Sequence, residues 1–241
     1  MDKLLTVVIP SYNVEKFLNQ TLDSFVCDEA VMKKFEVIVV DDGSKDNTAK
    51  IGKEYADKYP DTFRVISKEN GGHGSTINCG IRNAVGKYFK VVDGDDWVNT
   101  ADFVKLVEDL EKTESEYVFT NYNEYYDDVN RQKAVDFPQF KDGTEYDFAD
   151  VANKVYIPMH ALVIKTSVLK DNNIVIDEKC FYVDVEYVMF PVPFVNKVTF
   201  FDLHVYMYRL ALSTQSVSIL GFQKHINDHL RVTFHMFDFY R

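Results

Sequence analysis

The sequence has few cysteines and few basic residues, and each shortage excludes a class of protein. The three cysteines, Cys27, Cys79 and Cys180, lie far apart and form no Cys-x-x-Cys pair. Neither a disulfide framework nor a zinc site is therefore indicated, and reduced thiols are the plain interpretation. The 27 lysines and arginines against 38 aspartates and glutamates give a formal net charge of −11. That balance disfavours a nucleic-acid partner, because phosphate binding needs clustered positive charge.

Long apolar runs are also missing. No stretch approaches the length of an apolar transmembrane helix, and the first residues lead into a strand-like segment without a signal-peptide pattern. The chain as given is therefore expected to be soluble and cytoplasmic. It ends at Arg241 inside an aromatic-rich segment, so we expect a longer protein to continue there. A peripheral association with the inner face of a membrane, if the protein has one, is expected in that continuation.

Four short apolar runs rich in valine and isoleucine alternate with helical patterns in the first hundred residues. The runs predict buried strands at residues 4–9, 36–40, 63–67 and 88–92. Apolar residues at helical spacing and candidate N-caps predict helices at residues 14–25, 49–59 and 75–85. This alternation predicts an α/β fold with a mostly parallel sheet, in which ligands bind at the carboxyl ends of the strands.

The pattern changes in the second part of the chain. An amphipathic helix is expected to begin at Thr100. Strands are predicted at residues 117–126, 155–164, 198–201 and 205–208. Residues 127–150 are polar with little periodicity and are expected to form a variable loop region. Helices are expected at residues 184–196, where two prolines interrupt the middle, and at residues 221–240.

A polar motif follows each of the first four predicted strands. The motifs read Pro10-Ser11-Tyr12-Asn13, Asp41-Asp42-Gly43-Ser44, Asn70-Gly71-Gly72-His73-Gly74 and Asp93-Gly94-Asp95-Asp96. Because the carboxyl ends of parallel strands meet at one edge of a sheet, the four motifs are expected to converge. Three carboxylates within four residues suit Mg²⁺ or Mn²⁺ and predict a metal-diphosphate site. The alternative is ordinary turn chemistry at solvated strand ends.

Taken together and in this order, the segments Val7–Asn13, Val39–Thr48 and Asp93–Asp96 resemble those of family 2 glycosyltransferases with the GT-A fold. The resemblance extends over residues 4–218. It implies an α/β, Rossmann-like, mostly parallel sheet flanked by helices, with an acceptor-side mixed α+β second half. The expected organisation is a GT-A domain at residues 1–218, divided at residue 100 into nucleotide-sugar-binding and acceptor-side halves. A C-terminal helical segment at residues 219–241 follows it.

The resemblance also implies roles for residues at the strand ends. Pro10, Tyr12 and Asp41 are expected to line a nucleotide pocket, with Asn13 and Asp42 beside them. Asp41 would accept a hydrogen bond from a pyrimidine ring, and Tyr12 would pack beside that ring. Without the resemblance, Asp41 and Asp42 would be read as a solvated strand end that caps the next helix.

The diphosphate and its metal are assigned by the same resemblance. Asp93 and Asp95 form the D-x-D pair expected to reach the ribose and a Mn²⁺ or Mg²⁺ ion. Asn78 matches the family's Ala-Arg-Asn-x-Gly stretch, in which Ile77 replaces the usual arginine. Arg209, which is followed by a Ser-rich stretch at residues 213–218, is expected to compensate the diphosphate charge.

Three other cations are weaker candidates for that charge, because each is more typical of a surface or a loop: Lys68, His73 and Arg82.

The catalytic base is expected in the second half of the chain. In the family a Glu-Asp pair begins a helix there, and Phe181-Tyr182-Val183-Asp184-Val185-Glu186 occupies the matching place. Asp184 is the candidate base, Val183 stands where a glutamate is expected, and Glu186 is the competing carboxylate. A carboxylate at a helix start can equally complement the helix dipole.

The resemblance implies an inverting transferase that moves a sugar from a nucleotide sugar, expected to be a UDP sugar, to an acceptor hydroxyl. The acceptor would be a carbohydrate or a lipid-linked carbohydrate of bacterial surface polysaccharide synthesis. A catalytically degenerate binding module is one alternative, suggested by Ile77 and Val183. A sugar nucleotidyltransferase would carry a Gly-rich basic loop after the first strand, which Pro10–Asn13 is not. A glycoside hydrolase would need no nucleotide pocket.

Overall fold

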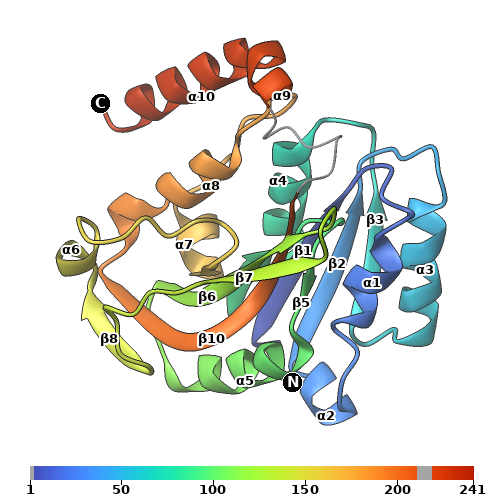
Figure 1. Ribbon diagram of the computed structural model, residues 1–241, viewed down its shortest axis with the longest axis horizontal. Helices are drawn as coiled ribbons and strands as arrows, with labels where there is room; N and C mark the ends of the chain where they lie inside the picture. Colours follow the sequence, from blue (N-terminus) through green and yellow to red (C-terminus); the bar gives the residue numbers. More distant parts are fainter. Residues whose placement is uncertain (1–2, 211–218) are drawn as a thin grey trace.

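The computed structural model describes residues 3–210 and 219–241, and its centre is one ten-stranded sheet (Figure 1). The main path of the sheet runs β3-β2-β1-β4-β9-β6-β10-β5, with β7 paired to β6 and β8 paired to β10. The strands are β1 Leu5–Ser11, β2 Phe35–Asp41, β3 Phe63–Ser67, β4 Tyr88–Val91, β5 Trp97–Val98, β6 Tyr117–Tyr126, β7 Arg131–Val135, β8 Thr144–Asp147, β9 Leu162–Lys165 and β10 Lys197–Leu210.

Helices cover both faces of this sheet (Figure 1). The α-helices are α1 Leu18–Asp23, α2 Glu29–Met32, α3 Thr48–Lys58, α4 His73–Asn83, α5 Thr100–Asp109, α6 Phe148–Val151, α7 Thr166–Asp171, α8 Asp184–Met189, α9 Ile219–Lys224 and α10 Ile226–Phe239. Two 3₁₀ turns lie at Leu110–Lys112 and Val192–Phe194. No helix in the described part of the chain is both long enough and apolar enough to cross a membrane.

The first four strands form where the apolar runs predict them, and β1, β2, β3 and β4 pair in parallel. All seven residues of β1 and all seven of β2 are buried, because helices cover both faces. Successive side chains of a strand point to opposite faces, so Val8 packs with Ile77 of α4 in one core. Val7 and Ile9 pack with Leu22 of α1 in the other. The α/β fold with a mostly parallel central sheet is therefore confirmed.

The second half differs from the prediction in several elements. Residues 127–150 are not only a loop, because β7 and β8 pair there with β6 and β10 through backbone hydrogen bonds. The two strands expected near residues 198–208 are one strand, β10, which continues through register shifts between Phe201 and Tyr206. The strand expected at residues 155–164 is confined to β9, and β5 was not predicted at all.

The C-terminal segment is also more complex than the pattern indicates. The helix expected from Asp184 ends at Met189, before Pro191, and a 3₁₀ turn replaces its second half. The segment expected as one helix at residues 221–240 consists of α9 and α10. Helix α10 lies along α8 (Figure 1), and its Val232 is 3% exposed within the same core as Ile77.

Candidate active site

Backbone hydrogen bonds bring the strand-end motifs together at one edge of the sheet. The amide of Asp42 donates to the carbonyl oxygen of Ser11 at 2.9 Å, and the amide of Gly94 donates to that of Pro10 at 3.1 Å. The motifs after β1, β2 and β4 are thus direct neighbours. A Cβ atom at position 94 would lie 2.9 Å from the Pro10 carbonyl oxygen, so glycine permits this close approach.

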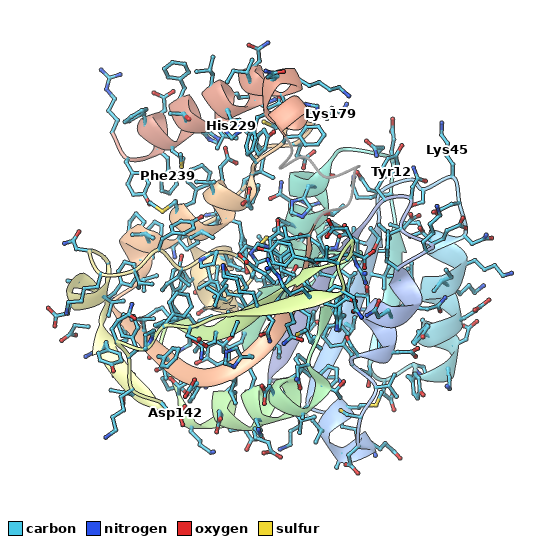
Figure 2. All side chains as sticks on the ribbon, viewed as in Figure 1. Tyr12, Lys45, Asp142, Lys179, His229 and Phe239 are labelled. Carbon is cyan, nitrogen blue, oxygen red and sulfur yellow. The ribbon has the colours of Figure 1, made fainter. Side chains whose placement is uncertain are left out.

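Tyr12 lies at the rim of this edge (Figure 2), and Asn13 follows it in the loop after β1. Tyr12 is 49% exposed, so its ring is free to meet a ligand. Asn13 has a φ of 55° and accepts a hydrogen bond through Oδ1 from the Lys45 amide at 2.8 Å. Its own amide donates to Ser44 Oγ at 3.0 Å. Asn13 therefore ties the loop after β1 to the loop after β2.

The two carboxylates after β2 have different surroundings. Asp41 is 4% exposed, and its Oδ1 accepts from the Ser44 amide at 3.1 Å. Asp42 is 2% exposed and accepts from Lys68 Nζ at 2.7 Å and from the amides of Gly71 and Gly72 at 2.9 and 2.8 Å. Asp42 therefore holds the glycine loop in place, and the predicted contact with a nucleotide would be indirect.

Asn78 is likewise engaged with the protein. Its side chain donates to the Ile176 carbonyl oxygen at 2.8 Å and accepts from the Ile176 amide at 2.9 Å. These bonds fasten the segment before α8 to α4. Ile77 is fully buried, so position 77 offers no side chain to a diphosphate.

A histidine from α4 faces the first carboxylate of the Asp93–Asp96 motif. His73 Nε2 lies 2.8 Å from Asp93 Oδ1, and both side chains are partly exposed. Burial opposes charge on both groups, but their mutual attraction and hydrogen bond outweigh it. The pKa of His73 is therefore raised and the pKa of Asp93 is lowered. His73, a candidate expected to lie on the surface or in a loop, is the partly exposed first residue of α4 and pairs with Asp93.

The other two carboxylates of the motif are more deeply placed. Burial and the nearby charge of Asp93 raise the pKa of Asp95 to about 6. Asp96 is 2% exposed and accepts from Tyr206 Oη at 2.6 Å and from the Arg209 amide at 2.7 Å. Burial, together with the neighbouring carboxylates, raises the pKa of Asp96 well above its ordinary value. Like charges are crowded here, which a bound cation would relieve.

The donor atoms of this corner suit a hard divalent cation. Ligand atoms of Asp93, Asp96 and His160 lie within 4.8 Å of one another. Carboxylate oxygens are what Mg²⁺ and Mn²⁺ prefer, so the residues present fit such an ion. The structure groups Asp93 with Asp96 and His160 and does not include Asp95 in that group, and the assignment of Asp93 and Asp95 as ligands remains a prediction.

Arg209 lies inside the protein and not at its surface. The residue is 5% exposed, and its guanidinium donates from Nε to the Asp95 carbonyl oxygen at 2.8 Å and to Gln20 Oε1 at 2.6 Å. It also pairs with Asp127 and lies over the ring of Trp97 at 4.7 Å. Arg209 thus braces the Asp95–Asp96 turn, and a contact with a diphosphate stays a prediction. The Ser-rich stretch at residues 213–218 lies outside the described residues.

The structure separates the two candidates for the base. Asp184, the first residue of α8, is partly exposed, and its charge acts on His73 and so faces the same corner. Burial raises the pKa of Asp184. The charge of His73 lowers this pKa, and the charge of Asp93 raises it. Glu186 is 0% exposed and accepts from the Asp177 amide at 2.7 Å. Only Asp184 of these two is open to a ligand.

A comparison with known families places this geometry. The model of the family described as glycosyl transferase family 2 matches residues 6–172, which is most of the chain. The chain belongs to glycosyltransferase family 2. The resemblance inferred from the motifs is thereby confirmed.

Curated relatives in this family match about half of the chain. It is 38% identical over 118 residues to the uncharacterized glycosyltransferase EpsJ of Bacillus subtilis, covering 49% of this chain and 33% of EpsJ. It is 33% identical over 111 residues to the minor teichoic acid biosynthesis protein GgaB of the same organism, covering 46% of this chain and 12% of GgaB. The matched segments thus span a third or less of these relatives.

Solved structures show the fold of the family 2 glycosyltransferase chain. Residues 1–349 of S. aureus TarS, in complex with UDP-GlcNAc, superpose with a TM-score of 0.72 at 21% identity, over 95% of this chain and 65% of that TarS fragment. The mannosyltransferase PcManGT of Pyrobaculum calidifontis, in complex with GDP-Man and Mn²⁺, superposes with a TM-score of 0.67 at 17% identity, over 98% of this chain and 65% of the PcManGT chain. The expected GT-A fold is therefore confirmed.

Two residues beside the candidate site were not predicted from the sequence. The His160 ring stacks on Tyr208 at 3.9 Å between centroids, and burial lowers its pKa to about 4. Lys90 is fully buried in β4, its Nζ donates to the His160 carbonyl oxygen at 2.8 Å, and burial lowers its pKa to about 7. The lysine inside the apolar run of residues 88–92 was a sequence signal that a buried charged group lies there. No sequence pattern marked His160.

Proposed function

We propose that the protein transfers a sugar from a nucleotide sugar, a UDP sugar, to an acceptor hydroxyl with inversion at the anomeric carbon. One observation carries the proposal. Asp93 after β4, His73 at the start of α4 and Asp184 at the start of α8 act on one another's charge at the carboxyl edge of the sheet. This arrangement supports a diphosphate site and a catalytic base that lie together, which is what a single displacement requires.

The donor would lie along the strand ends. Tyr12 would pack its exposed ring against the pyrimidine of the nucleotide. Asp41 would contribute a buried carboxylate at the end of β2. A Mn²⁺ or Mg²⁺ ion, held by Asp93 and Asp95, would supply Lewis-acid stabilisation of the leaving diphosphate. His73 adds positive charge on the same side, because its pKa is raised beside Asp93. It takes the place expected for the arginine that Ile77 replaces.

Asp184 would remove the proton of the acceptor hydroxyl. As the bond from that oxygen to the anomeric carbon forms, the bond from this carbon to the diphosphate oxygen breaks, and the proton passes to Asp184. Burial raises the pKa of Asp184, which brings the carboxylate closer to the operating pH of a general base. The enclosed carboxylate of Glu186 has no such access.

The acceptor is proposed to be a carbohydrate or a lipid-linked carbohydrate of a bacterial surface polymer. The printed name of one relative, minor teichoic acid biosynthesis protein, supports this class. The residues that would read the acceptor lie between Tyr122 and Pro158, where an exposed aromatic ring, Tyr156, is within electrostatic range of Asp184.

Separate substitutions of the carboxylates test these roles. Calorimetric titration of UDP with Mn²⁺ is expected to show lost metal-dependent binding in Asp93→Asn and Asp95→Asn. Asp184→Asn is expected to keep that binding while transfer falls about 10²- to 10⁴-fold, the usual contribution of a general base. The exposed Asp57 near the C-terminal end of α3 supplies a matched control, Asp57→Asn, in which neither property is expected to change.

The outcome of the same experiment distinguishes the alternatives. The wild-type protein is first assayed with UDP, GDP and dTDP sugars. Nucleotide binding without any turnover would favour the degenerate binding module. Unchanged transfer in Asp184→Asn would remove Asp184 as the base.

A further inference from the structure

The segment that leads to the candidate base is clamped between two parts of the chain. Residues 177–183, here called the base loop, run from the end of the segment tied to Asn78 to the start of α8. On the donor side the Lys179 amide donates to the Gly71 carbonyl oxygen at 2.6 Å. The Asp177 carbonyl oxygen faces the start of α4, with no room for a side chain at position 74. One face of the base loop therefore rests on the glycine loop.

Helix α10 holds the opposite face through charged groups. His235 Nδ1 lies 3.0 Å from Glu186 Oε1 and 3.3 Å from Asp177 Oδ1. Arg231 Nε lies 2.8 Å from Asp177 Oδ2. The Asp177 amide closes the arrangement by donating to Glu186 Oε2 at 2.7 Å. His235 thus bridges the first residue of the base loop and the first turn of α8, on either side of Asp184.

Aromatic rings of α9 and α10 fix the middle of the same loop. Tyr182 adopts a φ of 64°, which is unfavourable for a residue with a side chain. Its ring stacks on His229 at 3.6 Å with an interplanar angle of 14°, and the Phe181 ring lies 3.8 Å from His225. Such backbone strain persists only where surrounding contacts over-determine it. Figure 2 shows His229 and Lys179 on the same side of the molecule, where the base loop meets the C-terminal helices.

We propose that α10 positions the candidate base, with His235 as the central positioning residue. The inference rests on the proposed function of Asp184 and adds a role for residues 219–241, which the sequence marks only as a separate helical segment. The buried Glu186 explains the arrangement, because a fully enclosed carboxylate requires partners, and His235 and the Asp177 amide supply them. His235 therefore acts through the loop and not on substrate.

The test compares three substitutions on α10. His235→Ala removes the bridge, His235→Asn restores a donor near the position of Nδ1, and Phe234→Ala changes a neighbouring side chain that is 63% exposed. His235→Ala is expected to lower kcat about 10- to 100-fold with the donor KM within about twofold, because a shift near 1 Å at a reacting group has effects of this size. His235→Asn is expected to recover most of the loss, and Phe234→Ala to match the wild type.

Hydrogen exchange supplies a readout that does not depend on activity. The amides of residues 177–183 are expected to exchange faster in His235→Ala than in the wild type, and more slowly again in His235→Asn. Arg231→Gln removes the outer contact. Because this side chain is 51% exposed, the variant is expected to fold and to show the same effects to a smaller extent. Unchanged exchange in both His235→Ala and Arg231→Gln would overturn the proposal, as would faster exchange with wild-type kcat.

Failure of the proposal is distinguishable from failure of the proposed function. If the wild type transfers no sugar, the assignment of Asp184 falls, while exchange still decides whether α10 holds the base loop. An equal loss of kcat in His235→Ala and His235→Asn would also count against the proposal, because it would point to general damage to the fold.

Discussion

Substitution of Gly74 by alanine provides a direct test of the contact between α4 and the base loop. A Cβ atom at this position would lie 2.0 Å from the Asp177 carbonyl oxygen and 3.0 Å from Ile176 Cγ2. Since a carbon and a carbonyl oxygen approach to no closer than about 3.3 Å, one of the two backbones must move by roughly 1.3 Å. The glycine loop is fastened to Asp42 by two amide hydrogen bonds, so we expect the base loop to move.

The expected consequence is a large loss of activity with a small loss of stability. A displacement of about 1 Å at a reacting group costs about 10²-fold in rate, so kcat of Gly74→Ala should fall by about that factor. Alanine is favoured over glycine inside a helix by up to about 1 kcal/mol, which offsets part of the strain in the folded state. The free energy of unfolding should therefore change by less than about 2 kcal/mol, the middle of the range for overpacked sites.

Gly80 on the same helix supplies the matched control. Its Cβ would lie 2.4 Å from Val8 Cγ2, which faces the core and not the base loop. Gly80→Ala is expected to destabilise the protein by about 1–3 kcal/mol while kcat stays near the wild-type value. Urea unfolding and transfer kinetics measure both variants. Wild-type kcat in a folded Gly74→Ala protein would refute the reasoning.

Three further changes address the donor side and the core. Asp42→Asn replaces a carboxylate that accepts three hydrogen bonds by an amide. Urea unfolding should show a free energy of unfolding lower by about 1–3 kcal/mol, and the KM for the nucleotide sugar should rise. Tyr12→Ala should weaken UDP binding in calorimetry up to about tenfold, the size of one ring contact, without changing stability. The pKa of Lys90 is about 7 in the folded protein and ordinary in the unfolded chain, so between pH 7 and 9 Lys90 binds more protons when the chain is unfolded. The free energy of unfolding should therefore rise by up to about 2–3 kcal/mol over this range, and the rise should be missing in Lys90→Met. A parallel pH dependence in that variant would contradict the assignment.

The central strands were predictable because burial on two faces demands uninterrupted apolar runs, as in β1 and β2. Strand β7 carries no such demand. Four of its five residues are exposed, and it is held by backbone pairing with β6, which leaves no periodicity to detect. Strand β10 was divided in the prediction because its register shifts break the alternation of side chains on which such predictions rest.

The position of the candidate site was predictable, but the hydrogen bonds and ion pairs that its residues make within the protein were not. Strand-end motifs indicated which residue types gather at the edge, and the backbone bonds from Asp42 and Gly94 confirm that neighbourhood. Several of these side chains bond to residues that are far away in the sequence. Arg209 bonds Gln20 across 189 positions, and His235 meets Glu186 across 49. Such pairings arise from the packing of whole elements, which no local pattern encodes.

The register shifts within β10 have a consequence for recombining this fold with its relatives. Before them, residues 197–200 pair with β8 at the outer edge of the sheet, and after them Tyr206 and Arg209 brace the carboxylate corner. A bulged strand absorbs a local change in length or twist near the bulge. Strand β8 and residues 197–200 should therefore be exchangeable between homologues while the Asp93–Asp96 turn keeps its geometry. Chimeras joined at residues 202–204 would have their junction at the register shifts of β10, where the backbone pairing is already irregular.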